Sequence, residues 1–109
     1  MAILSETFEQ ILGLIKSGEV RISDHGYDEM ADDEIPVADV LSSVFCATVI
    51  EDYPNFPKGA CVLVLQKDCN DSPIHVAWGI PKGRATPAVL VTAYRPDPSR
   101  WEDGFTRRR

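Results

Sequence analysis

No stretch of this sequence is apolar over the roughly 20 residues that a membrane-spanning helix needs. Its first residues also lack the basic and then apolar pattern of a secretory signal. We therefore expect a cytoplasmic protein that has no membrane partner.

Cysteine is scarce as well, since Cys46, Cys61 and Cys69 are an odd number without CxxC spacing. Zinc sites need closely spaced ligand pairs, which neither Cys nor His supplies here. The DxDxDG calcium loop, the glycine-rich phosphate loop and the GxSxG and HExxH motifs are also absent. The sequence thus predicts no metal and no cofactor, with Cys46 and Cys61 as small core residues and Cys69 as a turn thiol.

What is present is the composition of one globular domain spanning residues 1–109, with 44% hydrophobic and 26% charged residues. The net charge of −6 argues against indiscriminate nucleic-acid binding, but it conceals a polarity. Residues 1–57 carry twelve acidic and two basic side chains (−10), and residues 58–109 carry five acidic and nine basic ones (+4). This asymmetry indicates either two faces with different partners or merely a solvated acidic surface.

The first half of the chain reads as helical. Apolar residues at helical spacing predict a helix over Thr7–Ser17 that Gly18 ends. Val20–Ile22 is short and β-branched, as in an edge strand or an extended connector. Ser23 or Asp24 can cap a second helix over about Gly26–Asp33, and Pro36 suits the first turn of a third helix.

The second half reads as strands separated by turns. The expected strands are Ala47–Asp52, Ala60–Lys67, Pro73–Ile80 and Ala88–Arg95. A basic loop spans 81–87, and a tail with a basic end covers 98–109, where Trp101 and Phe105 would serve as anchors. We therefore predict an α+β fold in which N-terminal helices pack on a four-stranded antiparallel meander sheet.

The two histidines, His25 and His75, lie in different settings, the first at a helix start and the second inside an apolar strand. Alternation puts His75 with Ala77 and Gly79 on one face of its strand. If Val89, Val91 and Ala93 meet the opposite, apolar face, His75 stands opposite Thr92 and diagonal to Tyr94. A one-residue slip of the register would undo this placement.

Several basic and acid/base groups in the sequence could converge on one site. A histidine or a phenol can take the proton of an RNA 2′-hydroxyl, another group can protonate the leaving oxygen, and a cation can stabilise the phosphorane. Alternatively, the histidines and the tyrosine are structural, and the basic residues keep a loop and a disordered terminus in water. The candidates are His25, His75, Tyr94 and Arg95, with Lys82, Arg84, Arg107 and Arg108 as RNA contacts.

An acidic cluster lies in the expected second helix. Asp28 and Asp32 are i,i+4 neighbours, as are Glu29 and Asp33, so like charges repel along one helical face. A basic partner or a cation would relieve this repulsion, and a solvated face without a role is the alternative. The cluster supports a second hypothesis, a non-catalytic protein-interaction module that uses its acidic helical face.

Four short segments occur in a recognisable order, namely Val20-Arg21-Ile22-Ser23-Asp24-His25, Val49-Ile50-Glu51-Asp52-Tyr53-Pro54, Ile74-His75-Val76-Ala77-Trp78 and Thr92-Ala93-Tyr94-Arg95-Pro96-Asp97. With these segments the chain resembles the bacterial family called domain of unknown function 4258. The resemblance implies a relation to small toxins of the RelE/MqsR/ParE type, hence a RelE-like fold and a ribonuclease that acts on mRNA, free or at the ribosome. It also implies a small antitoxin partner of the zinc-finger or helix-turn-helix type.

Position by position, the resemblance matches His25, His75 and Tyr94 to family residues, and Trp101 to the aromatic beyond them. Many family members carry arginines where this chain has Glu29 and Asp33, so any phosphate contact at those positions is reversed in charge. The leading expectation is a toxin-type, metal-independent endoribonuclease. In it His75 and Tyr94 act as acid and base, His25 as a second such group or an orienting group, and Arg95 as the phosphate stabiliser.

Overall fold

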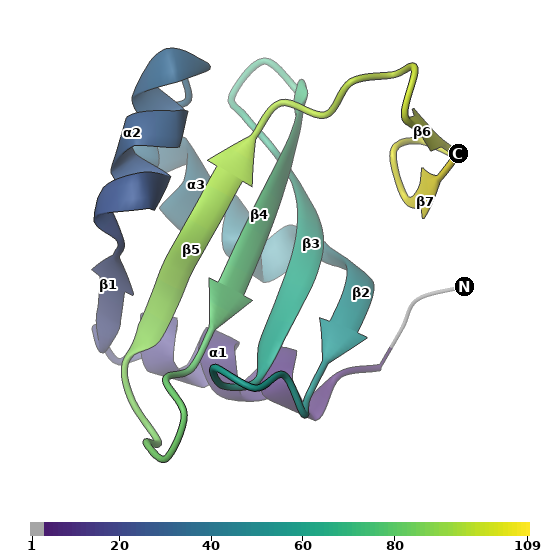
Figure 1. Cartoon of the computed structure of the whole chain (residues 1–109). Helices are drawn as coiled ribbons and strands as arrows, with labels where there is room; N and C mark the ends of the chain where they lie inside the picture. Colours follow the sequence, from purple (N-terminus) through teal and green to yellow (C-terminus); the bar gives the residue numbers. More distant parts are fainter. Residues whose placement is uncertain (1–3) are drawn as a thin grey trace.

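The computed structural model describes residues 4–109 and contains one five-stranded sheet with helices on one side (Figure 1). The strands lie in the order β1-β5-β4-β3-β2, and β1 runs parallel to β5 while the other neighbours are antiparallel. A separate two-stranded hairpin, β6 with β7, ends the chain. The helices are α1 (Glu6–Lys16), α2 (Asp24–Asp32), α3 (Val37–Ser43) and the 3₁₀ turn η1 (Val44–Cys46). The strands are β1 (Val20–Ile22), β2 (Thr48–Tyr53), β3 (Cys61–Lys67), β4 (Pro73–Gly79), β5 (Ala88–Tyr94), β6 (Trp101–Glu102) and β7 (Arg107–Arg108).

The α+β class is confirmed, but the four-stranded antiparallel meander is wrong. The short segment β1 joins the sheet as an edge strand, and its residues Val20–Ile22 pair in parallel with Ala88–Leu90. The N–H of Ala88 also donates to the Glu19 carbonyl at 2.9 Å, just before this pairing starts. A three-residue strand carries too little pattern to indicate its partner, so the sequence predicts Val20–Ile22 as an edge strand or a connector without placing it in the sheet.

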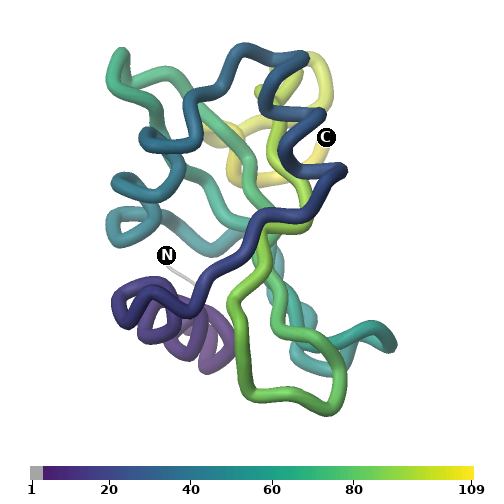
Figure 2. Tube along the Cα trace, turned by 90° about the vertical axis from the view of Figure 1, so that its left-hand side faces the viewer, coloured from purple at the N-terminus to yellow at the C-terminus, as the bar shows by residue number. Residues whose placement is uncertain are grey.

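Helices α1 and α3 cover one face of the sheet, α2 lies along the β5 edge, and the C-terminal segment lies on the other face. In Figure 2 the sheet is seen nearly edge-on, with α1 and α3 on one side of it. The main core lies under the helices, where Ile11, Val40, Val64, Val76 and Leu90 are all fully buried. A smaller cluster, formed by Ile50, Leu63 and Trp101, lies under the terminal hairpin on the opposite face.

A β-bulge in β5 sets which side chains reach each face. Pairing with β4 jumps from Ala77–Thr92 to Trp78–Leu90, so Val91 has no partner residue. Leu90 therefore enters the core, and Val91 is 42% exposed. The predicted register is wrong by two residues at His75, which lies opposite Tyr94, while Thr92 lies opposite Ala77. The bulge then shifts the register by one residue between Ala77 and Trp78.

A polar network connects the core to α3. The Trp78 indole N–H donates to Gln66 Oε1 at 3.0 Å, and the Gln66 amide donates to the Val40 carbonyl at 2.7 Å and to Ser43 Oγ at 2.9 Å. Trp78 is fully buried and Gln66 is 2% exposed. Every polar group of this buried glutamine side chain therefore has a protein partner.

The cysteine predictions are only partly right. Cys46 is exposed, because the 3₁₀ turn after α3 carries it away from the core, whereas Cys61 is half-buried in β3. Cys69 lies exposed in the turn between β3 and β4, as expected.

Within residues 4–109, no helix is long and apolar enough to cross a membrane.

Candidate functional site

The centre of the candidate site is the buried imidazole of His75, on the face of β4 that the helices leave open. One ring nitrogen, Nε2, lies 2.7 Å from the Phe105 carbonyl oxygen, and the other, Nδ1, lies 3.2 Å from Tyr94 Oη. A carbonyl oxygen can only accept, so Nε2 carries the proton and Nδ1 accepts from the tyrosine hydroxyl. Trp101 packs edge-on against the ring, with the centroids 4.3 Å apart.

Burial controls the protonation of this pair. It lowers the pKa of His75, against the opposing effects of the Phe105 carbonyl and the Glu51 charge, because a charged imidazole is poorly solvated there. Burial likewise raises the pKa of Tyr94. At neutral pH both rings are therefore neutral, as the hydrogen bond from tyrosine to histidine requires.

The depressed pKa of His75 predicts a pH-dependent stability. Below the unfolded-state pKa of about 6.5, the unfolded chain binds a proton that the folded chain does not, so the free energy of unfolding falls as the pH drops. The expected slope reaches at most about 1.4 kcal/mol per pH unit. Urea unfolding from about pH 7.5 to 5 measures it. His75→Gln should flatten the slope, and His25→Gln, which changes an exposed histidine, should leave it steep; equal slopes in all three proteins would contradict the prediction.

An ion pair from the chain terminus lies beside this pair. Arg108 donates from Nε to Glu51 Oε2 at 2.6 Å and from Nη2 to Oε1 at 3.0 Å. The Tyr53 hydroxyl donates to the same carboxylate at 2.9 Å, and the Arg108 guanidinium lies 4.7 Å from the Trp101 ring centroid. The bond from Arg108 holds the pKa of Glu51 below its usual value, and the arginine charge acts to lower the pKa of Tyr94. Sequence reasoning missed Glu51, Tyr53 and Phe105 as members of this site.

His25 does not join His75. It sits on α2 with a side chain that is 68% exposed, and its Nε2 lies 3.2 Å from Glu29 Oε1. Glu29 in turn accepts the Ala93 N–H at 3.3 Å, and its charge acts to raise the pKa of Tyr94. His25 is thus connected to the tyrosine side of the site only through Glu29.

Side chains of α2 and of the two residues that cap it hold the edge of β5 beyond the end of β1. Ser23 Oγ donates to the Val91 carbonyl at 2.9 Å, and Asp33 Oδ2 accepts the Arg95 N–H at 2.8 Å. Together with the Glu29 bond, these contacts satisfy backbone groups that a neighbouring strand would otherwise take. Glu29 and Asp33 therefore have structural partners, which the interpretation as a solvated face did not foresee.

We expect Asp33→Ala to lower the free energy of unfolding by about 1–3 kcal/mol, because the Arg95 N–H loses a charged acceptor. Asp32→Ala is the matched control, since this exposed neighbour should change stability by less than about 0.5 kcal/mol. Equilibrium urea unfolding compares the two variants. Equal losses would show that the edge bond contributes nothing beyond the charge removed.

A family model matches residues 22–95, more than half of the chain, under the description "Domain of unknown function (DUF4258)". The chain belongs to this family. No curated protein and no solved structure matches it. The matched range contains His25, Glu51, His75, Tyr94 and Arg95. It leaves α1 and the terminal hairpin outside, so in this DUF4258 chain the partners of His75 come both from within the matched range and from beyond it.

Arg95 of this DUF4258 chain turns away from His75. Its Nη1 lies 2.9 Å from Asp68 Oδ2, and its Nε and Nη2 reach the carbonyls of Asp33 and Glu34 at 3.3 and 3.4 Å. The guanidinium thereby ties the end of β5 to the end of α2 and to the turn between β3 and β4. Hydrogen bonds, first of all from the Ser72 N–H, lower the pKa of Asp68.

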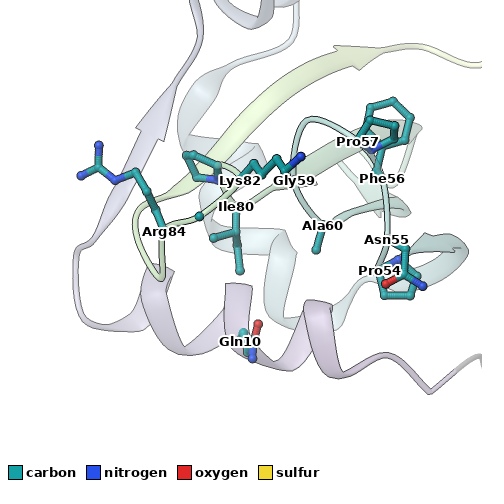
Figure 3. A pocket seen from close by; sticks show the side chains of 12 residues that line it. Gln10, Pro54, Asn55, Phe56, Pro57, Gly59, Ala60, Ile80, Lys82 and Arg84 are labelled. Atoms are coloured by element: carbon teal, nitrogen blue, oxygen red, sulfur yellow. The ribbon is translucent and has the colours of Figure 1, made fainter.

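The predicted RNA contacts fall into two places. Lys82 and Arg84 are exposed in the loop between β4 and β5, at the far end of the sheet from the terminal hairpin (Figure 1). There they line a hollow of about 370 Å³ together with the loop before β3 (Figure 3). Arg107 instead pairs with Glu102 and, at 3.0 Å, with Asp103, so the terminus is folded and not free. Among residues 4–109, no three His, Cys, Asp or Glu side chains gather closely enough to hold a metal ion.

Proposed function

We propose that this DUF4258 chain is a toxin-type, metal-independent endoribonuclease whose reactive group is the Tyr94 hydroxyl. The observation that supports the proposal is the directed chain of bonds from Tyr94 Oη to His75 Nδ1 and from His75 Nε2 to the Phe105 carbonyl. A base that is oriented by a third group, and that accepts from a hydroxyl, is the arrangement by which enzymes activate that hydroxyl. Tyr94 is only half-buried, so substrate needs to reach the phenol and not the enclosed imidazole.

The proposed reaction moves two protons at Tyr94. The substrate 2′-hydroxyl gives its proton to Tyr94 Oη as the phenol proton passes to His75 Nδ1, and the 2′-oxygen attacks the phosphorus. The bond to the 5′-oxygen breaks, and this leaving group takes a proton from a general acid, for which His25 beside Glu29 is the candidate. The products are a 2′,3′-cyclic phosphate and a 5′-hydroxyl. Burial disfavours the imidazolium formed on His75, and the Phe105 carbonyl and the Glu51 charge offset part of that cost.

Arg108 takes the phosphate-stabilising role in this proposal, in place of Arg95. Its guanidinium lies over Trp101 and acts electrostatically on Tyr94, whereas Arg95 is engaged by Asp68 and by two carbonyls that follow α2. An incoming phosphate then competes with Glu51 for Arg108. The resemblance to RelE/MqsR/ParE-type toxins adds the expectation of a cytoplasmic RNA substrate and of a small antitoxin of the zinc-finger or helix-turn-helix type.

A second candidate function is the non-catalytic interaction module. The observation that favours it is the exposed stripe of Asp24, Asp28 and Asp32, which lie one helical turn apart on α2, with no basic side chain paired to them among residues 4–109. Such a stripe would bind a basic surface of a partner protein.

The test is cleavage of a defined RNA by the purified chain in EDTA, free and with ribosomes present. We expect 2′,3′-cyclic phosphate ends and a rate that falls about 100-fold or more in Tyr94→Phe, the size of effect that general base catalysis supplies. His75→Gln should lose a similar factor while staying folded. Tyr27→Phe is the matched control, because it removes the hydroxyl of a tyrosine that is 51% exposed on α2.

The outcomes separate the two functions. Cleavage that Tyr94→Phe retains would remove the phenol from the mechanism. No cleavage by the wild-type chain under either condition would refute the ribonuclease and favour the interaction module.

A further inference from the structure

The open face of the sheet continues from the His75 site into a second hollow, which is apolar, has a volume of about 470 Å³ and is distinct from the one that Lys82 and Arg84 line. The hollow lies at the end of the sheet away from the terminal hairpin, where β4 and β5 approach the loop that connects them. Ala77 belongs both to the small cluster under the hairpin and to the wall of the hollow, so the two regions adjoin. Its lining includes Phe56, Cys61, Ala77, Gly79, Val89 and Val91.

Two features of the strands create this hollow. Gly79 has no side chain, and a Cβ placed there would lie 3.5 Å from the Cys61 Cβ and 3.6 Å from Val91 Cγ2, so any larger residue would fill the floor. The bulge at Val91 turns that side chain out of the core and onto the open face, where Val89 already lies. The result is an unfilled apolar surface on the open face of the sheet.

Basic and aromatic side chains border the hollow. Lys58 lines it, and the Lys82 N–H donates to the Lys58 carbonyl at 3.2 Å, which joins the two loops that carry these lysines. Figure 3 shows the Lys82 side chain extending toward the loop of Gly59, while Arg84 extends away. Neither lysine has an acidic partner among residues 4–109. Phe56 is 48% exposed.

A continuous line of contacts leads from the candidate site to this border. Arg108 binds Glu51, Glu51 accepts from Tyr53, and the Tyr53 ring lies 6.4 Å from the Phe56 ring. Tyr53 is 44% exposed. Exposed aromatic rings beside unpaired cations are the surface on which single-stranded nucleic acids stack their bases and place their phosphates.

We propose that this hollow binds one unstacked base of single-stranded RNA, with the adjoining phosphates at Lys58 and Lys82. The inference rests on the proposed ribonuclease function, to which it adds a subsite for a further nucleotide on the same face of the sheet. The unpaired lysines favour a polyanion over an uncharged peptide, and the contacts through Tyr53 place that polyanion on the same face as Tyr94.

The test is fluorescence anisotropy with two labelled ten-nucleotide probes of 2′-O-methyl RNA, which cannot be cleaved by 2′-hydroxyl attack. One probe is oligo(A), and the other has the same backbone with abasic sites in the central positions. We expect the wild-type chain to bind oligo(A) about tenfold more tightly than the abasic probe. Gly79→Val should erase this difference, and Lys58→Ala should weaken both probes and reduce the salt dependence of binding.

Two further variants guard against a folding artefact. Gly13→Val is the matched control, since its Cβ meets nothing within 4 Å on α1, and it should bind as the wild type does. Val91→Gln changes a side chain that is already 42% exposed, so it tests the hollow with little risk to the fold, and it should also erase the preference for bases.

Equal affinity of the wild-type chain for the two probes would overturn the inference, as would a preference that survives both Gly79→Val and Val91→Gln. In those cases the lysines contact phosphate alone, and the hollow is left to an apolar segment of a protein. Because the probes are not cleaved, the binding result is independent of catalysis. Base-dependent binding without RNA cleavage would support the subsite and refute the proposed catalysis, whereas cleavage without base-dependent binding would do the reverse.

Discussion

Trp78→Ala is expected to lower the free energy of unfolding by about 3–5 kcal/mol. Trp78 is fully buried in β4, so alanine leaves a large cavity beneath the helices. It also removes the N–H that binds Gln66 Oε1 at 3.0 Å, and that oxygen then has no partner inside the core. A domain of this size has a total stability of about 5–15 kcal/mol, so the variant should unfold at much lower urea concentration.

One variant of Trp78 separates packing from hydrogen bonding, and a variant of an exposed phenylalanine is its control. Trp78→Phe keeps most of the apolar volume and should lose about 1–3 kcal/mol through the orphaned Gln66 oxygen. Phe45→Ala is the control for removal of an aromatic ring, and because Phe45 is 51% exposed it should cost less than about 1 kcal/mol. If Phe45→Ala were as costly as Trp78→Ala, the core would not lie where the structure places it.

Gly59→Ala is expected to lower the free energy of unfolding by about 3 kcal/mol. Gly59 has φ +125, and a Cβ there would overlap the Ile80 carbonyl oxygen and lie 2.7 Å from the Lys82 nitrogen. The loops before β3 and after β4 must therefore separate, which breaks the backbone bond between Lys82 and Lys58. Urea unfolding measures the loss, and the anisotropy assay should show weaker binding of both RNA probes at once.

Gly83→Ala distinguishes this clash from the general cost of a left-handed backbone. Gly83 also has a positive φ (+75), but nothing lies within 4 Å of its Cβ position. Only the conformational penalty of about 1–2 kcal/mol applies there. If Gly59→Ala and Gly83→Ala lowered the free energy of unfolding equally, the close approach of the loops at Gly59 would contribute nothing to the loss.

Local pattern predicted the elements well and their pairing less well. Apolar spacing located α1 and the four longer strands to within about two residues, because these segments are long enough to show a period. Val20–Ile22 shows no period, and its parallel partner lies 68 residues further along the chain. The bulge at Val91 inserts one residue into an otherwise regular alternation, and nothing in Val89-Leu90-Val91 distinguishes which of the two faces each valine takes.

The sequence predicted only the part of the candidate site that lies on the two neighbouring strands β4 and β5. Alternation placed His75 and Tyr94 on one sheet face, since both lie in long strands. The bond between Arg108 and Glu51 joins residues 57 positions apart, and it depends on a hairpin of two-residue strands that leaves no mark in the sequence. In the sequence, Glu29 and Asp33 look like ordinary surface charges. They accept hydrogen bonds from the backbone of the β5 edge only because β1 ends before it covers that edge.

That ending of β1 has a consequence for how copies of this chain can associate. Fibrils grow when each added copy finds an open strand edge on both sides. On the β5 side of the sheet in residues 4–109, β1 offers only three residues, and the side chains of α2 already hold the backbone beyond them. The opposite edge, β2, is the longer one. Two copies that paired through β2 would form a closed pair, because the opposite edge offers a third copy only the three residues of β1.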